Sequence, residues 1–148
     1  MSGLLVLGVL TAVFADLVTM TKDPPLLTEI KTRYKKIRES LPAEERWSLI
    51  CKKHAIITGT GPTSGTVGQN VNKGYEIYIC LDGEDIESAM YVFLHELAHL
   101  SVKEYDHTQK FWDNFRDLRV ICKQIGVYNP SKQTTQYCGE KITATASQ

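Results

Sequence analysis

The chain has 148 residues and no formal net charge, because 17 lysine and arginine side chains balance 17 aspartate and glutamate side chains. This length suits one domain with one hydrophobic core, and the balanced charge argues against a nucleic-acid partner, which a basic surface would attract. The four cysteines form no CxxC pair, which argues against a zinc ribbon or a thioredoxin-like site. We predict buried free thiols, with a Cys122–Cys138 disulfide as the alternative.

An apolar run occupies residues 3–15, and Asp16 interrupts it. A run of that length fits the core of a signal peptide or a buried helix, and its extension through Asp16 reaches the lower limit for a membrane span. No basic residue precedes the run, whereas lysines and arginines follow it. This asymmetry favours a membrane anchor at 1–22, with the rest of the chain on the cytoplasmic side. The alternatives are a signal cleaved after Ala15, which gives a secreted protein, and a buried core helix.

The N-terminal half then predicts one helix and three strands. Apolar side chains at helical spacing indicate a helix at 25–41 that starts in a proline pair. A mixed apolar segment predicts a strand at 47–58, and a loop rich in glycine and threonine follows it. Residues with β-branched and aromatic side chains predict strands at 67–71 and 75–81, joined by a turn at 72–74.

The C-terminal half predicts two helices and a polar extension. Apolar residues line a broad helical face from residue 84 to about residue 102. A second apolar stripe predicts a helix at 108–125, which Gly126 is suited to end. Residues 129–148 are polar, and the pair Tyr137-Cys138 is the part of this extension most suited to docking on the core.

The predicted helix at 84–102 carries the motif HExxH, formed by His95, Glu96 and His99. Residues four apart lie on one face of a helix, so the two imidazoles can bind the same zinc ion. Glu96 lies about 100° further round the helix, where its carboxylate can take a proton from a water on the metal. The alternative is a pair of hydrogen-bonded core histidines, which needs another network to offset the cost of burying them.

A third nitrogen ligand is available in His107, eight residues after His99. The metzincin pattern requires a glycine at the position of Val102, so this chain does not follow it. Glu104 is too close to the helix to act as the carboxylate ligand of the other common zinc sites. We therefore predict that His107 completes the zinc site, whereas His54 is interpreted as an ordinary structural histidine.

Several other residues are candidates for supporting roles. Peptide hydrolysis needs a group that stabilises the developing oxyanion, and Tyr105, Tyr128 and Tyr137 are candidates. Asp106 and Asp113 are candidates for orienting a ligand imidazole through its second nitrogen. The sequence does not choose among them.

The segments HELAHL at 95–100 and DHTQKFW at 106–112 resemble the small zincins of the WLM, SprT and YgjP types, which carry HELxHL and then (N/D)H(S/T)xxFW. The loop between these two motifs is about two residues longer than the usual form. The resemblance implies an α+β minimal zincin core, in which a small sheet packs on the HExxH helix. It also implies His95, His99 and His107 as zinc ligands, Glu96 as the base, and residues 75–81 as the edge strand that holds an extended peptide.

The predicted function is a zinc-dependent metallopeptidase that acts on protein or peptide substrates. We expect a membrane anchor at 1–22, a peptidase domain at 23–128 and an extension at 129–148. The two motif segments also look like those of membrane-anchored proteins of large DNA viruses. This likeness predicts a virion or a viral membrane as the location and viral structural proteins as partners. The alternative is a catalytically silent zincin fold that serves as a viral membrane or capsid component. Degradation of proteins crosslinked to DNA, as in WLM and SprT relatives, is disfavoured by the neutral charge.

Overall fold

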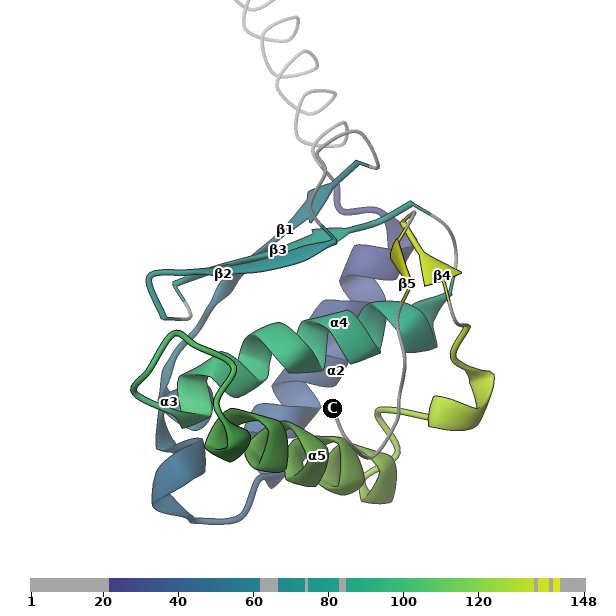
Figure 1. The fold of residues 1–148 in the computed structure, drawn as a ribbon. Helices are drawn as coiled ribbons and strands as arrows, with labels where there is room; N and C mark the ends of the chain where they lie inside the picture. The colour runs from purple at the N-terminus through teal and green to yellow at the C-terminus, as the bar shows by residue number, and fades with distance from the viewer. Residues whose placement is uncertain are drawn as a thin grey trace, which may run out of the picture.

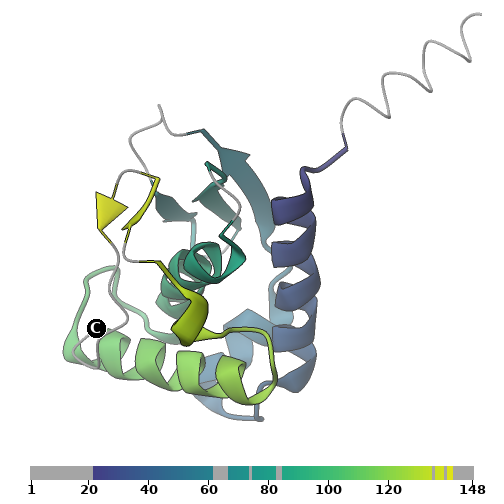
Figure 2. The ribbon, with the colours of Figure 1, turned by 90° about the vertical axis from the view of Figure 1, so that its right-hand side faces the viewer.

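Helix α4 (Ile86–Ala98) runs through the middle of the structure, with a sheet on one side and helix α5 (Gln109–Gln124) on the other (Figure 1). Figure 2 looks nearly along α4 and shows helix α2 (Pro25–Ser40) packed beside it. The computed structural model describes residues 22–61, 67–73, 75–82, 85–134, 136–138 and 140–141. This arrangement confirms the predicted α+β class with a small sheet on the HExxH helix.

The sheet has three strands in the order β1-β3-β2. Strand β1 (Ile56–Thr60) runs parallel to the central strand β3 (Glu76–Cys80). Strand β2 (Gly68–Val71) runs antiparallel to β3, which follows from the short turn that joins them. The inward side chains of β3, Ile77 and Ile79, are completely buried under the sheet. The strands predicted at 67–71 and 75–81 are thereby confirmed.

Helix α2 agrees with the predicted helix at 25–41. Pro25 occupies the first turn, where the missing amide hydrogen removes no helical bond. The buried side chains recur at helical spacing and face α4 and β1; they are Leu27, Ile30, Tyr34 and Ile37. The lysines between them are exposed, as the amphipathic pattern requires, whereas Arg33 is half-buried and pairs with Glu87 of α4.

The strand predicted at 47–58 is wrong in its first half. A short 3-10 helix covers Glu45–Trp47, helix α3 covers Ser48–Lys52, and extended structure begins only at Ile56. Trp47 and Ile50 are both completely buried and lie three residues apart, a spacing that places both on one face of a helical turn. Burial of that face against α2 and the turn at His99–Ser101 decides the conformation of a segment whose local pattern was ambiguous.

Both predicted C-terminal helices are present. Asp85 caps α4 by accepting hydrogen bonds from the amides of Glu87 and Ser88. After Ala98 the chain tightens into a 3-10 turn at His99–Ser101. Helix α5 is capped by Thr108 and followed by Gly126, whose φ of 79° is the left-handed conformation that commonly terminates a helix.

The cysteines pair differently from both predicted arrangements. Cys80, at the end of β3, forms a disulfide with Cys138, across a sequence separation of 58. Cys122 is a buried free thiol, and Cys51 is a free, half-buried one. The free-thiol prediction is therefore wrong for two of the four cysteines, and so is the Cys122–Cys138 alternative. Cysteine spacing does not encode connectivity, which depends on where the C-terminal segment docks.

The docked C-terminal segment contains the two-stranded hairpin of β4 (Gln136–Tyr137) and β5 (Glu140–Lys141). The Tyr137 side chain is buried, and its hydroxyl donates a hydrogen bond to the carbonyl of Cys80. The pair predicted to dock therefore does so, at the strand that leads into α4.

The predicted membrane location requires correction. No helix in the described part of the chain is long and apolar enough to cross a bilayer. The longest of those helices, α2 and α5, have 16 residues each, whereas a span takes about 20. The apolar run at 3–15, on which the predicted anchor rests, lies outside the described residues. The Cys80–Cys138 disulfide also argues against the predicted cytoplasmic side, because disulfides persist mainly in oxidising compartments.

Replacing Cys138 with serine is expected to lower the free energy of unfolding by about 2–4 kcal/mol, because the unfolded chain gains freedom when the bridge is absent. Urea denaturation of the oxidised protein measures this change, and Cys51→Ser, which removes a free thiol, is the matched control. Equal stability of the parent and Cys138→Ser would contradict the disulfide assignment.

Candidate metal centre

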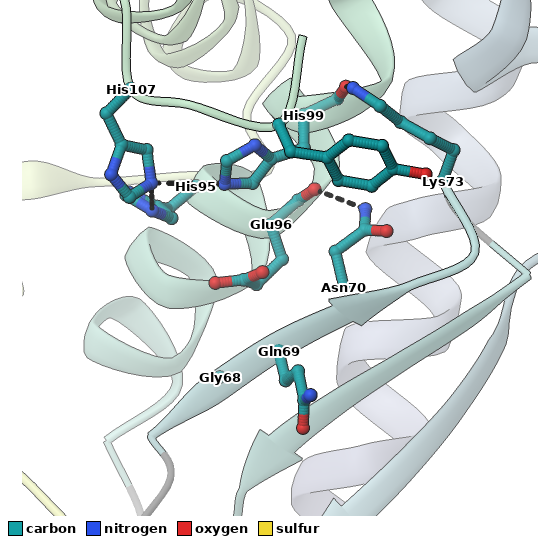
Figure 3. Close-up of a pocket in the computed structure, with 9 residues that line it drawn as sticks. Gly68, Gln69, Asn70, Lys73, His95, Glu96, His99 and His107 are labelled. Carbon is teal, nitrogen blue, oxygen red and sulfur yellow. Dashed lines mark hydrogen bonds between the residues drawn. The ribbon is translucent and has the colours of Figure 1, made fainter.

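Three histidine side chains from separate segments converge on one point (Figure 3). His95 lies on α4, His99 lies in the 3-10 turn that follows it, and His107 lies just before α5. The Nε2 atom of His107 is 3.2 Å from Nε2 of His95 and 3.2 Å from Nε2 of His99. The nitrogens available for binding all lie within 4.8 Å of one another. The structure thus brings together all three residues predicted as ligands.

These distances fit a shared metal ion better than hydrogen bonding. A neutral imidazole nitrogen either donates one hydrogen or accepts through one lone pair. Nε2 of His107 can therefore satisfy only one of its two contacts by hydrogen bonding. An ion with bonds of about 2.0–2.1 Å in tetrahedral geometry would instead hold its ligand nitrogens about 3.3 Å apart. The three residues can form a metal site.

Burial keeps two of these imidazoles neutral. It lowers the pKa of His95 to about 3 and that of His99 to about 4, and the charges of neighbouring histidines act in the same direction. A neutral imidazole has a free lone pair, which is the form that binds metals. Both side chains are therefore ready ligands over the neutral pH range.

Aromatic side chains from α5 form the wall behind the imidazoles. Phe111 stacks on His99, with 4.4 Å between the ring centroids. Trp112 lies against His107 at 5.2 Å, and Phe115 meets His95 edge-on at 5.2 Å. Such contacts restrict the orientation of each ring. The Phe111-Trp112 pair in the sequence thus has a clear structural role beside the histidines.

Glu96 shares a hollow of about 240 Å³ with the three histidines. Its side chain comes from α4 and is only 9% exposed. Burial raises the pKa of Glu96 to about 7, partly opposed by a hydrogen bond from the backbone of Asn70. A carboxyl group with a pKa near the working pH can both accept and release a proton, as a general base must.

The strand beside this hollow is β2, not the segment 75–81 that was predicted as the edge. That prediction is wrong because β3 lies in the centre of the sheet, between β1 and β2. Cys80 N donates to Val67 O, which identifies residue 67 as bonded to β3. Since such bonding alternates along an antiparallel pair, the backbone groups of Gly68 point away from β3, and the backbone amide of Asn70 donates to Glu96.

Gly68 and Asn70 also bring β2 close to the helix. A Cβ atom at Gly68 would lie 2.4 Å from Val92 Cγ1 and 3.2 Å from Glu96 Cγ, so this approach requires glycine. Asn70 Nδ2 donates to the backbone oxygen of Glu96 at 2.8 Å. The sequence predicted the strand at 67–71 but assigned no role to Gly68 or Asn70. The available signal was a glycine within a short strand, which can mark a close approach of another segment.

The three tyrosines considered for oxyanion stabilisation lie in different parts of the structure. Tyr105 lines the hollow with the histidines. Tyr128 and Tyr137 are buried elsewhere, where their hydroxyls donate to Gln133 and to the Cys80 carbonyl.

Two of the remaining polar candidates have other partners, and the third, Asp106, is exposed. Asp113 accepts hydrogen bonds from Gln109 and Arg116 on the surface of α5. His54 contacts Arg38 at 2.6 Å, outside the histidine cluster.

We expect the purified protein to bind about one divalent metal ion per chain, because three ligands converge on a single point. His107→Ala should weaken this binding by at least ~100-fold, beyond the loss typical of residues that only support a ligand. Metal analysis after dialysis and titration against a chelator measure both quantities. His54→Ala removes a histidine outside the cluster and should retain the metal. Unchanged affinity in His107→Ala would contradict the site.

Comparison with known proteins agrees with this geometry. The model of the WLM domain family matches residues 19–148. Uncharacterized protein R325 of Acanthamoeba polyphaga mimivirus is 31% identical over 119 residues, which cover 74% of this chain and 60% of that protein. Uncharacterized protein 136R of Invertebrate iridescent virus 6 is 31% identical over 87 residues, which cover 53% of this chain and 46% of that protein.

The chain therefore spans about half of the length of the curated relatives that it matches. No solved structure matches it. The family match covers the histidine cluster, the sheet and both of the helices that hold the site. The chain belongs to the WLM domain family, which has a metallopeptidase-like fold.

Proposed function

We propose that this protein is a zinc-dependent peptidase in which Glu96 acts as the general base. The observation that carries this proposal is the meeting of three imidazoles and one buried carboxylate in a single hollow. Three histidine nitrogens are a donor set of catalytic zinc sites, which keep a further position open. Membership of the WLM family supports the same chemistry.

The residues of the hollow divide the chemical work. Zinc, when held by the three histidines, supplies a Lewis acid and makes water more acidic. The Glu96 carboxylate accepts a proton from the attacking water. It then delivers this proton to the amine nitrogen that leaves when the peptide bond breaks. Burial raises the pKa of Glu96 to about 7 in the metal-free protein, which is the range suited to a general base.

The edge position of β2 supports an extended polypeptide as the substrate. The backbone groups of Gly68 point away from β3 and can pair with a peptide that adds to the sheet as a further strand. Gly68 also lines the hollow that holds Glu96. A peptide bound there would pass the base, so we propose unfolded or extended protein segments as the substrate class. Because both curated relatives are viral proteins, viral structural proteins are the partners to test first.

Replacing Glu96 with glutamine is expected to reduce peptide hydrolysis roughly 100- to 10,000-fold, the usual contribution of a general base. The amide cannot accept the proton, but the three histidines remain, so zinc content should be unchanged. Cleavage of an unfolded protein and a peptide library, followed by mass spectrometry, measures the activity.

Glu39→Gln is the matched control, because the same change is made on an exposed side chain of α2, which does not line the hollow. It should cleave like the parent. Undiminished cleavage by Glu96→Gln would rule out the mechanism. A parent protein that holds zinc but cleaves no peptide would instead favour the non-catalytic alternative, a zincin fold kept for structure or interaction.

A further inference from the structure

Lys73 lies in the turn after β2 and reaches across to the metal loop, the segment 100–106 between His99 and His107. Its Nζ atom donates to the carbonyl oxygens of His99 at 2.9 Å, Val102 at 2.9 Å and Glu104 at 2.6 Å. A lysine ammonium has three N–H donors, and here all three bind backbone oxygens of this one stretch of chain. The side chain is therefore committed to holding the loop rather than exposed to solvent as an ordinary surface charge.

The backbone at Lys73 adopts a conformation that lysine rarely takes. Its φ is 49°, and the preceding Asn72 has a φ of 52°. Both values are left-handed, a region that crowds the Cβ atom and that glycine enters far more easily. An unfavourable conformation persists only where surrounding contacts enforce it. The three carbonyls bound by Nζ are contacts of that kind.

The metal loop has few hydrogen bonds of its own, so the hydrogen bonds from Lys73 matter for its position. The helical carbonyls end in the 3-10 turn at His99–Ser101, where the last acceptors have no partner within the helix. Residues 103–107 are all exposed. Among the described residues, none of these five takes part in a backbone–backbone hydrogen bond. A cation at the end of the helix also complements the helix dipole.

We propose that Lys73 is a positioning residue for the metal site. It fixes the metal loop so that His107 meets His95 and His99, without itself touching the ion. Lys73 lies in the turn after β2, so its side chain links the edge strand to the segment that carries the third ligand. The inference rests on the proposed zinc site, but its structural part, the fixed loop, can be measured without metal.

Two variants distinguish the hydrogen bonds made by the Lys73 side chain from the backbone conformation of the turn. Lys73→Met keeps the length of the side chain and removes the donors. Lys73→Gly also removes the donors but relieves the left-handed backbone, so the turn and the fold are retained. Lys103→Met is the matched control, since Lys103 is exposed and has no hydrogen bond or ion pair with any described residue. Lys73→Arg, which keeps a cation and its donors, tests for rescue.

We expect both Lys73→Met and Lys73→Gly to bind zinc about 10- to 100-fold more weakly than the parent in chelator competition, the loss typical of residues that support a ligand. The visible spectrum of the cobalt-substituted variants should shift, because the position of His107 changes. Lys103→Met should match the parent in both measurements, and Lys73→Arg should recover part of the affinity. Parental affinity and spectrum in both donor-free variants would overturn the proposal.

A parent that takes up no metal would refute the proposed function separately. In that case the role of Lys73 is tested by the NMR order parameters of the amides of residues 102–107 in the metal-free protein. Loss of the Lys73 hydrogen bonds in Lys73→Gly should lower these order parameters from near the rigid value of about 0.85 towards 0.6 or below. Equal order parameters in the parent and Lys73→Gly would overturn the positioning role.

Discussion

A helix that carries polar side chains through a hydrophobic core must give each of them a partner, and α4 does so differently at its two ends. At its start, Glu87 is paired with Arg33 at 2.9 Å and accepts from the amide of Asn129 at 2.6 Å. At its end, the imidazoles of His95 and His99 meet His107, whose single lone pair or hydrogen cannot satisfy both. The first end is complete within the protein, whereas the second is suited to a bound ion.

The elements around α4 serve this second end. Helix α5 supplies the aromatic wall that orients the imidazoles, and β2 approaches Glu96 closely because Gly68 has no side chain. The same closeness puts the edge strand of the sheet beside the carboxylate. In the proposed function, substrate binding and proton transfer would both depend on one packing contact, that of β2 on α4. Rigid placement of reacting groups in this way lowers the cost of reaching the transition state.

Two segments outside the helix hold its ends in place. The C-terminal segment is joined to the end of β3 by the Cys80–Cys138 disulfide. It is joined to the start of α4 by Thr134, whose amide and hydroxyl contact the Ser88 hydroxyl. The turn after β2 is fastened to the other end by Lys73. Both fastenings join residues distant in sequence, so the position of the site is defined by the whole fold and not by the motif helix alone.

The sequence by itself determined the features that depend on local spacing. It predicted α2, α4 and α5 from helical periodicity, and it placed His95 and His99 on one face because residues four apart are neighbours in any helix. Tertiary structure decided which strand forms the open edge, which cysteine meets Cys80, and that Trp47 belongs to a helical turn. It also placed the Lys73 ammonium against three backbone oxygens of the chain around His99. These outcomes depend on contacts between distant residues, and a local pattern carries no record of which distant surface a segment will meet.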